Sequence, residues 1–381
     1  MNLKLRSDYI YIGSYLNLLL VIFLTWLKPL PVVIQMVMYT FPTIYIGSYL
    51  SLNQILINPI TGEREQKAES LTRKDAILFP LIGSGALLSL YLAYKFLPAY
   101  WVNLLLTLYL AIIGIFTLSE TILQFSSLII NTKSGVIIEK YCNFFGLYKN
   151  SQDERGYQIK ITIHELWSFI ISLILGITWL LTDSWIIHNI LAISFCIQAI
   201  SLISLGNFKI GIILLSGLFV YDIFWVFGTN VMITVAKSFQ GPAKIIFPIS
   251  YDPWKQSILG LGDIVIPGLF IALCLRFDLK DTVNKHIQIK EIILNNYPAK
   301  TFISVLIAYQ LGLLITACVM FYFKAAQPAL LYLVPFCILS LLASLYHRSQ
   351  FIDAWNYSEE TEDLNRQNNE SEVNSQEKKE N

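Results

Sequence analysis

Ten long apolar runs dominate this 381-residue chain and limit what it can fold into. Most approach the roughly 20 residues that a helix needs to cross the hydrocarbon core of a bilayer. Charged residues make up only 14% of the chain, and its mean hydropathy is +0.58. We expect membrane-spanning helices over residues 9–27, 32–52, 76–94, 101–126, 164–181, 185–205, 210–230, 256–276, 301–320 and 328–346. The sequence therefore predicts an all-α polytopic membrane protein.

Charge and cysteine content exclude several other classes of protein. The net charge of +1 provides no basic field for nucleic acid. The five cysteines show no paired spacing, which argues against a disulfide framework or a zinc site. His164-Glu165 begins a zinc-protease motif, but Ser168 stands where its second histidine belongs. We expect no metal, no cofactor and no nucleic-acid partner.

Lysines and arginines favour one orientation of the spans. They crowd alternate loops, as the positive-inside rule predicts for cytosolic segments. With a cytosolic N-terminus, the loop at 127–163 and the C-terminal tail are also cytosolic, whereas the loop at about 231–255 faces the lumen. Ile159, Ile161 and Ile163 alternate with polar residues, which predicts a small β-hairpin in the long loop.

The chain divides by composition into four parts. The first span follows Lys4 and Arg6 but offers no small-residue cleavage site, so we expect a retained signal-anchor; the alternative is a cleaved signal. VMITVA (231–236) follows the span at 210–230 and is a separate interfacial helix, a lid over a site within the bundle, or the end of a longer tilted span. The parts are a signal segment 1–31, an N-terminal membrane bundle 32–205, a membrane core 206–350, and a polar, disordered tail 351–381.

Two aspartates interrupt consecutive apolar runs. Lys209 precedes Asp222 by 13 residues, and Arg276 follows Asp263 by 13 residues. At 1.5 Å per helical residue, both aspartates then lie about 20 Å from the cytosolic boundary. Consecutive spans are usually neighbours in space. The sequence therefore predicts that two carboxylates meet inside the membrane.

A carboxylate pair at this depth has more than one use. Two close carboxylates cannot both ionise cheaply, so they share a proton, as in the catalytic pair of an aspartic protease. Gly260 and Gly262, on either side of Leu261, would let a substrate backbone approach, although small residues also serve helix contacts. Depth alone leaves open a carboxylate-lined channel or a proton-coupled transporter.

Three short strings narrow the choice: Tyr221-Asp222, Gly260-Leu261-Gly262-Asp263 and Pro328-Ala329-Leu330. Together they resemble the signature strings of the presenilin and signal peptide peptidase family of intramembrane aspartyl proteases. They lie in order within three of the predicted spans, and the similarity runs from about residue 32 to 346, closer to the signal peptide peptidase branch. The family has nine spans, so the resemblance implies a nine-span presenilin-like bundle with one extra N-terminal span here.

The resemblance implies a role for each matching position. Asp222 and Asp263 would be the catalytic aspartates, which activate water without a cofactor. Pro328 also suits the first turn of the last span, where its missing N–H costs nothing. The residues expected to shape the site or hold substrate are Tyr221, Gly260, Leu261, Gly262, Gln327, Pro328, Ala329 and Leu330.

Topology and family together imply the substrates and partners. The lumenal loop between the catalytic spans inverts the site relative to presenilins, so type II substrates with a cytosolic N-terminus, such as leftover signal peptides, are expected within the lipid bilayer. Homo-oligomers and partners in endoplasmic reticulum degradation also fit the family. A non-catalytic membrane chaperone that uses the same groove remains a further alternative.

The C-terminal tail contains a candidate localisation signal. Lys378 and Lys379 resemble the dilysine retrieval signal of endoplasmic reticulum membrane proteins, although a lysine pair is also common in charged tails. The expected localisation is the endoplasmic reticulum membrane with a cytosolic tail. The sequons that begin at Asn356 and Asn369 should then remain unglycosylated.

Overall fold

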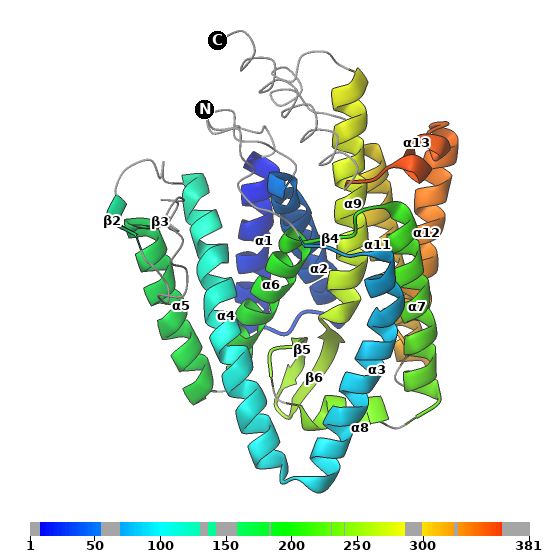
Figure 1. The fold of residues 1–381 in the computed structure, drawn as a ribbon. Coiled ribbons are helices and arrows are strands. Elements are labelled where there is room, and N and C mark those ends of the chain that lie inside the picture. The colour runs from blue at the N-terminus through cyan, green and yellow to red at the C-terminus, as the bar shows by residue number, and fades with distance from the viewer. Residues whose placement is uncertain are drawn as a thin grey trace, which may run out of the picture.

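The computed structural model describes residues 8–54, 69–129, 136–141, 158–182, 184–229, 231–239, 241–285, 299–323 and 327–359. Every predicted apolar run forms a helix over most of its length, and within these described ranges eight helices are long and apolar enough to cross a membrane. The all-α polytopic membrane fold is confirmed. The long helices are α1 (Asp8–Leu27), α2 (Val32–Leu50), α3 (Arg73–Phe96), α4 (Ala99–Ile129), α5 (Ile163–Thr182), α6 (Trp185–Leu202), α7 (Phe208–Phe227), α9 (Gly262–Lys285), α11 (Lys300–Phe323) and α12 (Leu330–His347), as drawn in Figure 1.

Short elements join these helices. The predicted hairpin is present: β2 (Val136–Tyr141) pairs antiparallel with β3 (Gln158–Thr162). A second hairpin joins β5 (Lys244–Tyr251) to β6 (Trp254–Gly260), and β1 (Glu69–Ser70) lies parallel to β4 (Ile203–Ser204). The remaining short elements are the 3₁₀ turn η1 (Ser51–Gln54) and the helices α8 (Val231–Ser238) and α13 (Phe351–Asn356).

The predicted helix over residues 256–276 is wrong at its start. Residues 254–260 form strand β6 instead, and α9 begins only at Gly262. Pairing with β5 along the whole strand satisfies the backbone there, with Ile245 opposite Leu259 and Lys244 opposite Gly260. Because α7 ends at Phe227, the VMITVA segment belongs to the separate helix α8, which packs against α3.

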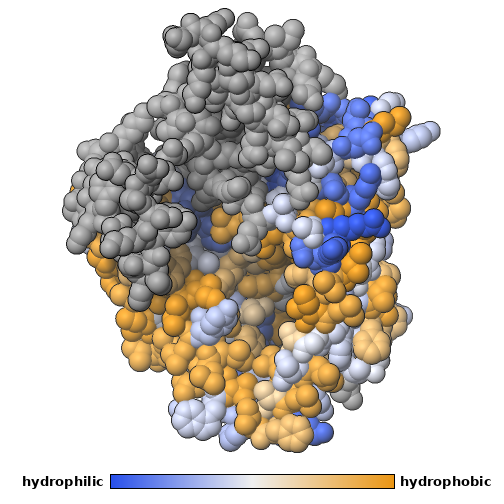
Figure 2. All heavy atoms as spheres, viewed as in Figure 1, coloured by the Kyte–Doolittle hydropathy of each residue, from blue (hydrophilic) through white to orange (hydrophobic). Residues whose placement is uncertain are grey.

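Helix α9 lies at the centre of the bundle. Its residues from Leu269 to Leu275 are almost completely buried, and α2, α6, α7, α11 and α12 all pack against it. The outer helices differ: α3, α4 and α5 expose many large apolar side chains, including Leu81, Leu105 and Ile174. Figure 2 shows this apolar surface across the middle of the molecule. Such a broad exposed surface suits contact with lipid tails.

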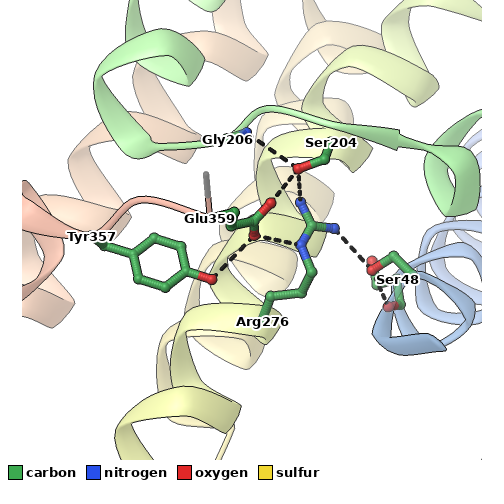
Figure 3. A network of polar contacts seen from close by, with 7 residues as sticks. Ser48, Ser204, Gly206, Arg276, Tyr357 and Glu359 are labelled. Carbon is green, nitrogen blue, oxygen red and sulfur yellow. Dashed lines mark hydrogen bonds and ion pairs between the residues drawn. The ribbon is translucent and has the colours of Figure 1, made fainter. Parts of the chain in front are cut away.

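Polar contacts around Arg276 hold the second half of α9 in place, and Figure 3 shows them. Arg276 is fully buried, and its Nε lies 2.8 Å from Oε1 of Glu359. The same guanidinium donates to Ser51 Oγ at 3.0 Å and to Ser204 Oγ at 3.4 Å. Ser204 Oγ also donates to Oε2 of Glu359. We call Ser51, Ser204, Arg276 and Glu359 the Arg276 cluster; it joins four segments of the chain.

Residues 351–359, which we expected to belong to a disordered tail, are folded onto the bundle. Helix α13 covers residues 351–356, and the buried Tyr357 ring packs between Phe208 of α7 and Phe277 of α9. The Tyr357 hydroxyl donates to Glu359 at 3.1 Å. Apolar packing and a buried ion pair thus order a segment that looks polar in sequence. Lys378, Lys379 and the second sequon lie outside the described residues.

Candidate active site

Asp222 projects from the fourth turn of α7, a helix built almost entirely from apolar residues. The side chain is 4% exposed, and its Oδ2 accepts a hydrogen bond from the backbone N–H of Leu330 at 3.0 Å. Leu330 is the first residue of α12, so this N–H has no partner within its own helix. Ala329, at the N-cap, has no side-chain acceptor to offer. Asp222 therefore caps α12 from the neighbouring helix.

Asp263 stands in the first turn of α9, immediately after the β5–β6 hairpin. Leu261 begins this turn, because its carbonyl accepts from Ile264 N at 3.1 Å and from Val265 N at 2.8 Å. The Leu261 N–H is in turn bonded to the carbonyl of Ala243, beside β5. The hairpin thus sets where α9 begins. A helix N-terminus carries positive partial charge, which suits a carboxylate at this position.

The two aspartates lie at one level on neighbouring helices, as their depth predicts. Helices α7 and α9 pack against each other with the Phe208 and Phe277 rings 5.4 Å apart, and each aspartate lies 14 helical residues from that contact. Their settings differ: Asp222 is buried and receives an external N–H, whereas Asp263 is half-buried at a helix start. The structure thus holds an acidic pair between a helix middle and two helix N-termini.

The other predicted residues surround this pair unevenly. Tyr221 turns toward α3, where a Cβ added at Gly83 would lie 3.7 Å from the tyrosine ring. Pro328 is buried but lies before the N-cap rather than within the first turn of α12, because that helix begins at Leu330. Its carbonyl accepts from Leu331 N at 3.3 Å. Gln327, half-buried, leads into this turn.

One contact was missed from sequence. The hydroxyl of Tyr309, on α11, donates to the backbone carbonyl of Asp263 at 3.2 Å. Tyr309 lies in an ordinary apolar run, where nothing local distinguishes it from a packing tyrosine. The available signal was Pro267, four residues after Asp263, because proline cannot supply the helical N–H for that carbonyl.

The two motif glycines should respond differently to alanine. A Cβ at Gly260 would lie 3.4 Å from Oδ2 of Asp263, whereas a Cβ at Gly262 meets nothing within 4 Å. Gly260→Ala would place a methyl group in van der Waals contact with the carboxylate, so we expect it to restrict the carboxylate and lower kcat by about 10-fold, since misplacement by 1 Å can cost about 100-fold. Gly262→Ala should leave kcat within about twofold and act on KM, if substrate fills that open space. Steady-state kinetics of both variants check this prediction. Equal losses of kcat in the two variants would contradict it.

Comparison with known proteins places this arrangement in a family. A model of the signal peptide peptidase family matches residues 63–361. The match leaves out α1 and α2 and extends past the expected limit of 346 to include α13 and Glu359. It thus contains both aspartates, the Leu330 amide and the Arg276–Glu359 pair.

Individual relatives agree with the family match. Signal peptide peptidase of Mus musculus is 40% identical over 275 residues, which are 71% of this chain and 69% of that protein. The Homo sapiens protein of the same name has the same identity and coverage. A probable intramembrane protease of Schizosaccharomyces pombe is 33% identical over 321 residues, 84% of this chain and 92% of its own length. The chain belongs to the signal peptide peptidase family of intramembrane aspartyl proteases.

Proposed function

We propose that Asp222 and Asp263 are the catalytic pair with which this protease hydrolyses peptide bonds inside the membrane. The observation that carries the assignment is the position of the two aspartates at one level on the packed helices α7 and α9, with Asp222 fixed by the Leu330 N–H. The ionised member takes a proton from water, and the protonated member donates to the scissile carbonyl. Both steps use only side chains and water, so we propose that no cofactor takes part.

The residues around the pair have supporting roles in this proposal. The Leu330 N–H and the N-terminus of α12 orient Asp222, which assigns Pro328 and Ala329 the task of placing that helix start. Leu261 starts α9 under Asp263, and Gly260 leaves space for its carboxylate. Tyr221 packs toward α3 and acts on the site only through the position of α7. Gln327 has the proposed role of bordering the bound substrate.

Topology selects the substrate class that we propose. The β5–β6 hairpin and α8 lie at one end of the bundle, and β2–β3 and α13 lie at the other, as Figure 1 shows. Among the described residues, most lysines and arginines lie in the parts of the helices and strands nearer the α13 end, which supports a cytosolic position for it. Substrates would then be type II spans with a cytosolic N-terminus, such as signal peptides left in the membrane.

Substrate orientation gives the direct test. One model transmembrane peptide, inserted into proteoliposomes in either direction relative to the purified protein, should be cut at least about 10-fold faster as a type II span. Mass spectrometry of the products locates the cut, and an inactive Asp263→Asn protein gives the background. Equal cutting in both directions would contradict the proposed orientation while leaving the catalytic pair intact.

The proposed location is the endoplasmic reticulum membrane, with the tail in the cytosol and Lys378 and Lys379 as its retrieval signal. The support is the lysine pair near the end of the sequence together with the positive-inside count. We also propose the division into 1–31, 32–205, 206–350 and 351–381. The second and third parts share a core, because α2 and α6 pack directly on α9.

Glycosylation tests the position of the tail. With a cytosolic tail, the sequons that begin at Asn356 and Asn369 never meet the lumenal transferase, so glycosidase treatment of the protein from cells should leave its mass unchanged. Lys255→Asn creates an Asn-Gln-Ser sequon on the opposite end of the bundle and serves as the comparison. A glycosidase-sensitive mass that disappears with Asn369→Gln would overturn the topology.

A further inference from the structure

The first turn of α9 lacks one of its own hydrogen bonds. In an α-helix, the carbonyl of Asp263 would accept from the N–H of the residue four positions later. That residue is Pro267, which lies inside α9 and has no N–H. A carbonyl left without a donor inside a membrane protein is destabilising, because lipid offers no replacement for water. The backbone of the proposed catalytic aspartate thus needs a donor from elsewhere.

Tyr309 of α11 provides that donor. Its side chain is completely buried, and its hydroxyl lies 3.2 Å from the carbonyl oxygen of Asp263. Helices α11 and α9 pack against each other, so the tyrosine reaches the carbonyl as part of the core. The hydrogen bond links two elements that are 46 residues apart in sequence.

The rest of α9 is held by close packing just beyond the proline. A Cβ at Gly268 would lie 2.5 Å from Cδ1 of Ile200 and 3.6 Å from Cγ1 of Ile44, so α6 and α2 touch the bare backbone there. The helix after Pro267 therefore has little freedom to shift. The first turn, which carries Asp263, lacks the helical hydrogen bond to the Asp263 carbonyl and is the part that an outside contact can still orient.

We infer that Tyr309 is a positioning residue for the proteolytic reaction, and that it sets the direction of the Asp263 carboxylate by replacing the hydrogen bond that Pro267 cannot make. Tyr309 itself touches the Asp263 backbone rather than the reacting atoms. The inference rests on the proposed role of Asp263 as a catalytic aspartate. It predicts that the effects of substituting Tyr309 and Pro267 on kcat are not additive, although the Tyr309 hydroxyl bonds neither the proline nor the carboxylate.

A double-mutant cycle tests the inference. Tyr309→Phe keeps the buried ring and removes only the hydroxyl, and we expect kcat to fall about 10-fold with KM within about twofold, because orientation rather than binding is lost. Pro267→Ala returns an N–H to the Asp263 carbonyl. In that background, Tyr309→Phe should lower kcat by less than about twofold. Steady-state cleavage of one signal-peptide substrate by the four purified proteins supplies the cycle.

The controls separate positioning from general packing. Tyr94→Phe also removes a tyrosine hydroxyl, one that donates to Asn103 Oδ1 at 2.6 Å. This hydrogen bond does not involve the aspartates, so the substitution should leave kcat unchanged. Full activity of Tyr309→Phe, or the same loss in the Pro267→Ala background, would overturn the inference. Asp263→Asn run alongside tests the proposed function separately: full activity of that variant would remove the catalytic role itself.

Discussion

Replacing Asp222 or Asp263 by asparagine is expected to lower proteolysis by at least about 100-fold in each single variant, since positioned acids and bases contribute about 10²–10⁴-fold. Each role needs its own carboxyl group: one must accept a proton from water and the other must donate one to the carbonyl. Neither amide can do either. Cleavage of a signal-peptide substrate by the purified protein in reconstituted membranes measures the loss.

The cap on α12 makes the choice of substitution at Asp222 informative. Asparagine keeps a side-chain oxygen that can still accept from Leu330 N, whereas alanine removes the acceptor that α12 lacks at its own N-cap. Asp222→Ala should therefore also lower the free energy of unfolding by about 0.5–2 kcal/mol relative to Asp222→Asn, the range for a lost N-cap. Asp252→Asn, in the exposed turn between β5 and β6, is the matched control with normal activity. Normal proteolysis by Asp222→Asn or Asp263→Asn would remove the catalytic assignment.

Glu359→Ala is expected to lower the free energy of unfolding by about 3 to 5 kcal/mol, the cost of breaking a buried ion pair by removing one partner. The Arg276 side chain is 0% exposed and that of Glu359 is 17% exposed, so the guanidinium would keep its charge in the core with serine hydroxyls as its remaining hydrogen-bond acceptors among the described residues. Equilibrium unfolding in mixed detergent micelles, with helix content as the signal, measures the change.

Two variants show whether the charge is responsible. Glu359→Gln preserves size and an acceptor oxygen but leaves the Arg276 charge unpaired, so it should retain only part of the stability. Replacing Lys209, whose ammonium lies 5.0 Å from the centre of the Trp355 ring at the surface, by alanine should cost less than about 1 kcal/mol. Because Arg276 follows Asp263 by 13 helical residues, about 20 Å, kcat per folded molecule should not change. A Glu359→Ala protein as stable as the parent would show that the pair contributes no net stability.

Local pattern was enough to predict most helices and one hairpin. Long apolar runs must satisfy their backbone within the membrane, and a helix does so within a single segment, which explains why the predicted spans matched. The alternating isoleucines in the long loop predicted the β2–β3 hairpin for a similar local reason. The aspartates drew attention because a carboxylate in an apolar helix is costly without a use.

Strand β6 shows why part of the apolar pattern was misread. The apolar run from 256 to 276 looks continuous in the sequence. No residue in it indicates that the segment before Gly262 pairs with β5 as a strand instead of forming a helix. A strand needs its partner, and that partner lies across a turn in a segment we assigned to the loop. Periodicity cannot tell a short buried strand from a helix segment in such a run.

By itself, the sequence determined the membrane class, the positions of most spans and the family strings that single out Asp222 and Asp263, because each of these depends on residues close together in the chain. Only the tertiary structure decided that Asp222 caps α12, that Tyr309 completes the turn carrying Asp263, and that Glu359 neutralises Arg276. Each of those contacts joins groups far apart in sequence. Their physical basis is the same: a buried polar group must find a partner, and the fold determines which one comes within reach.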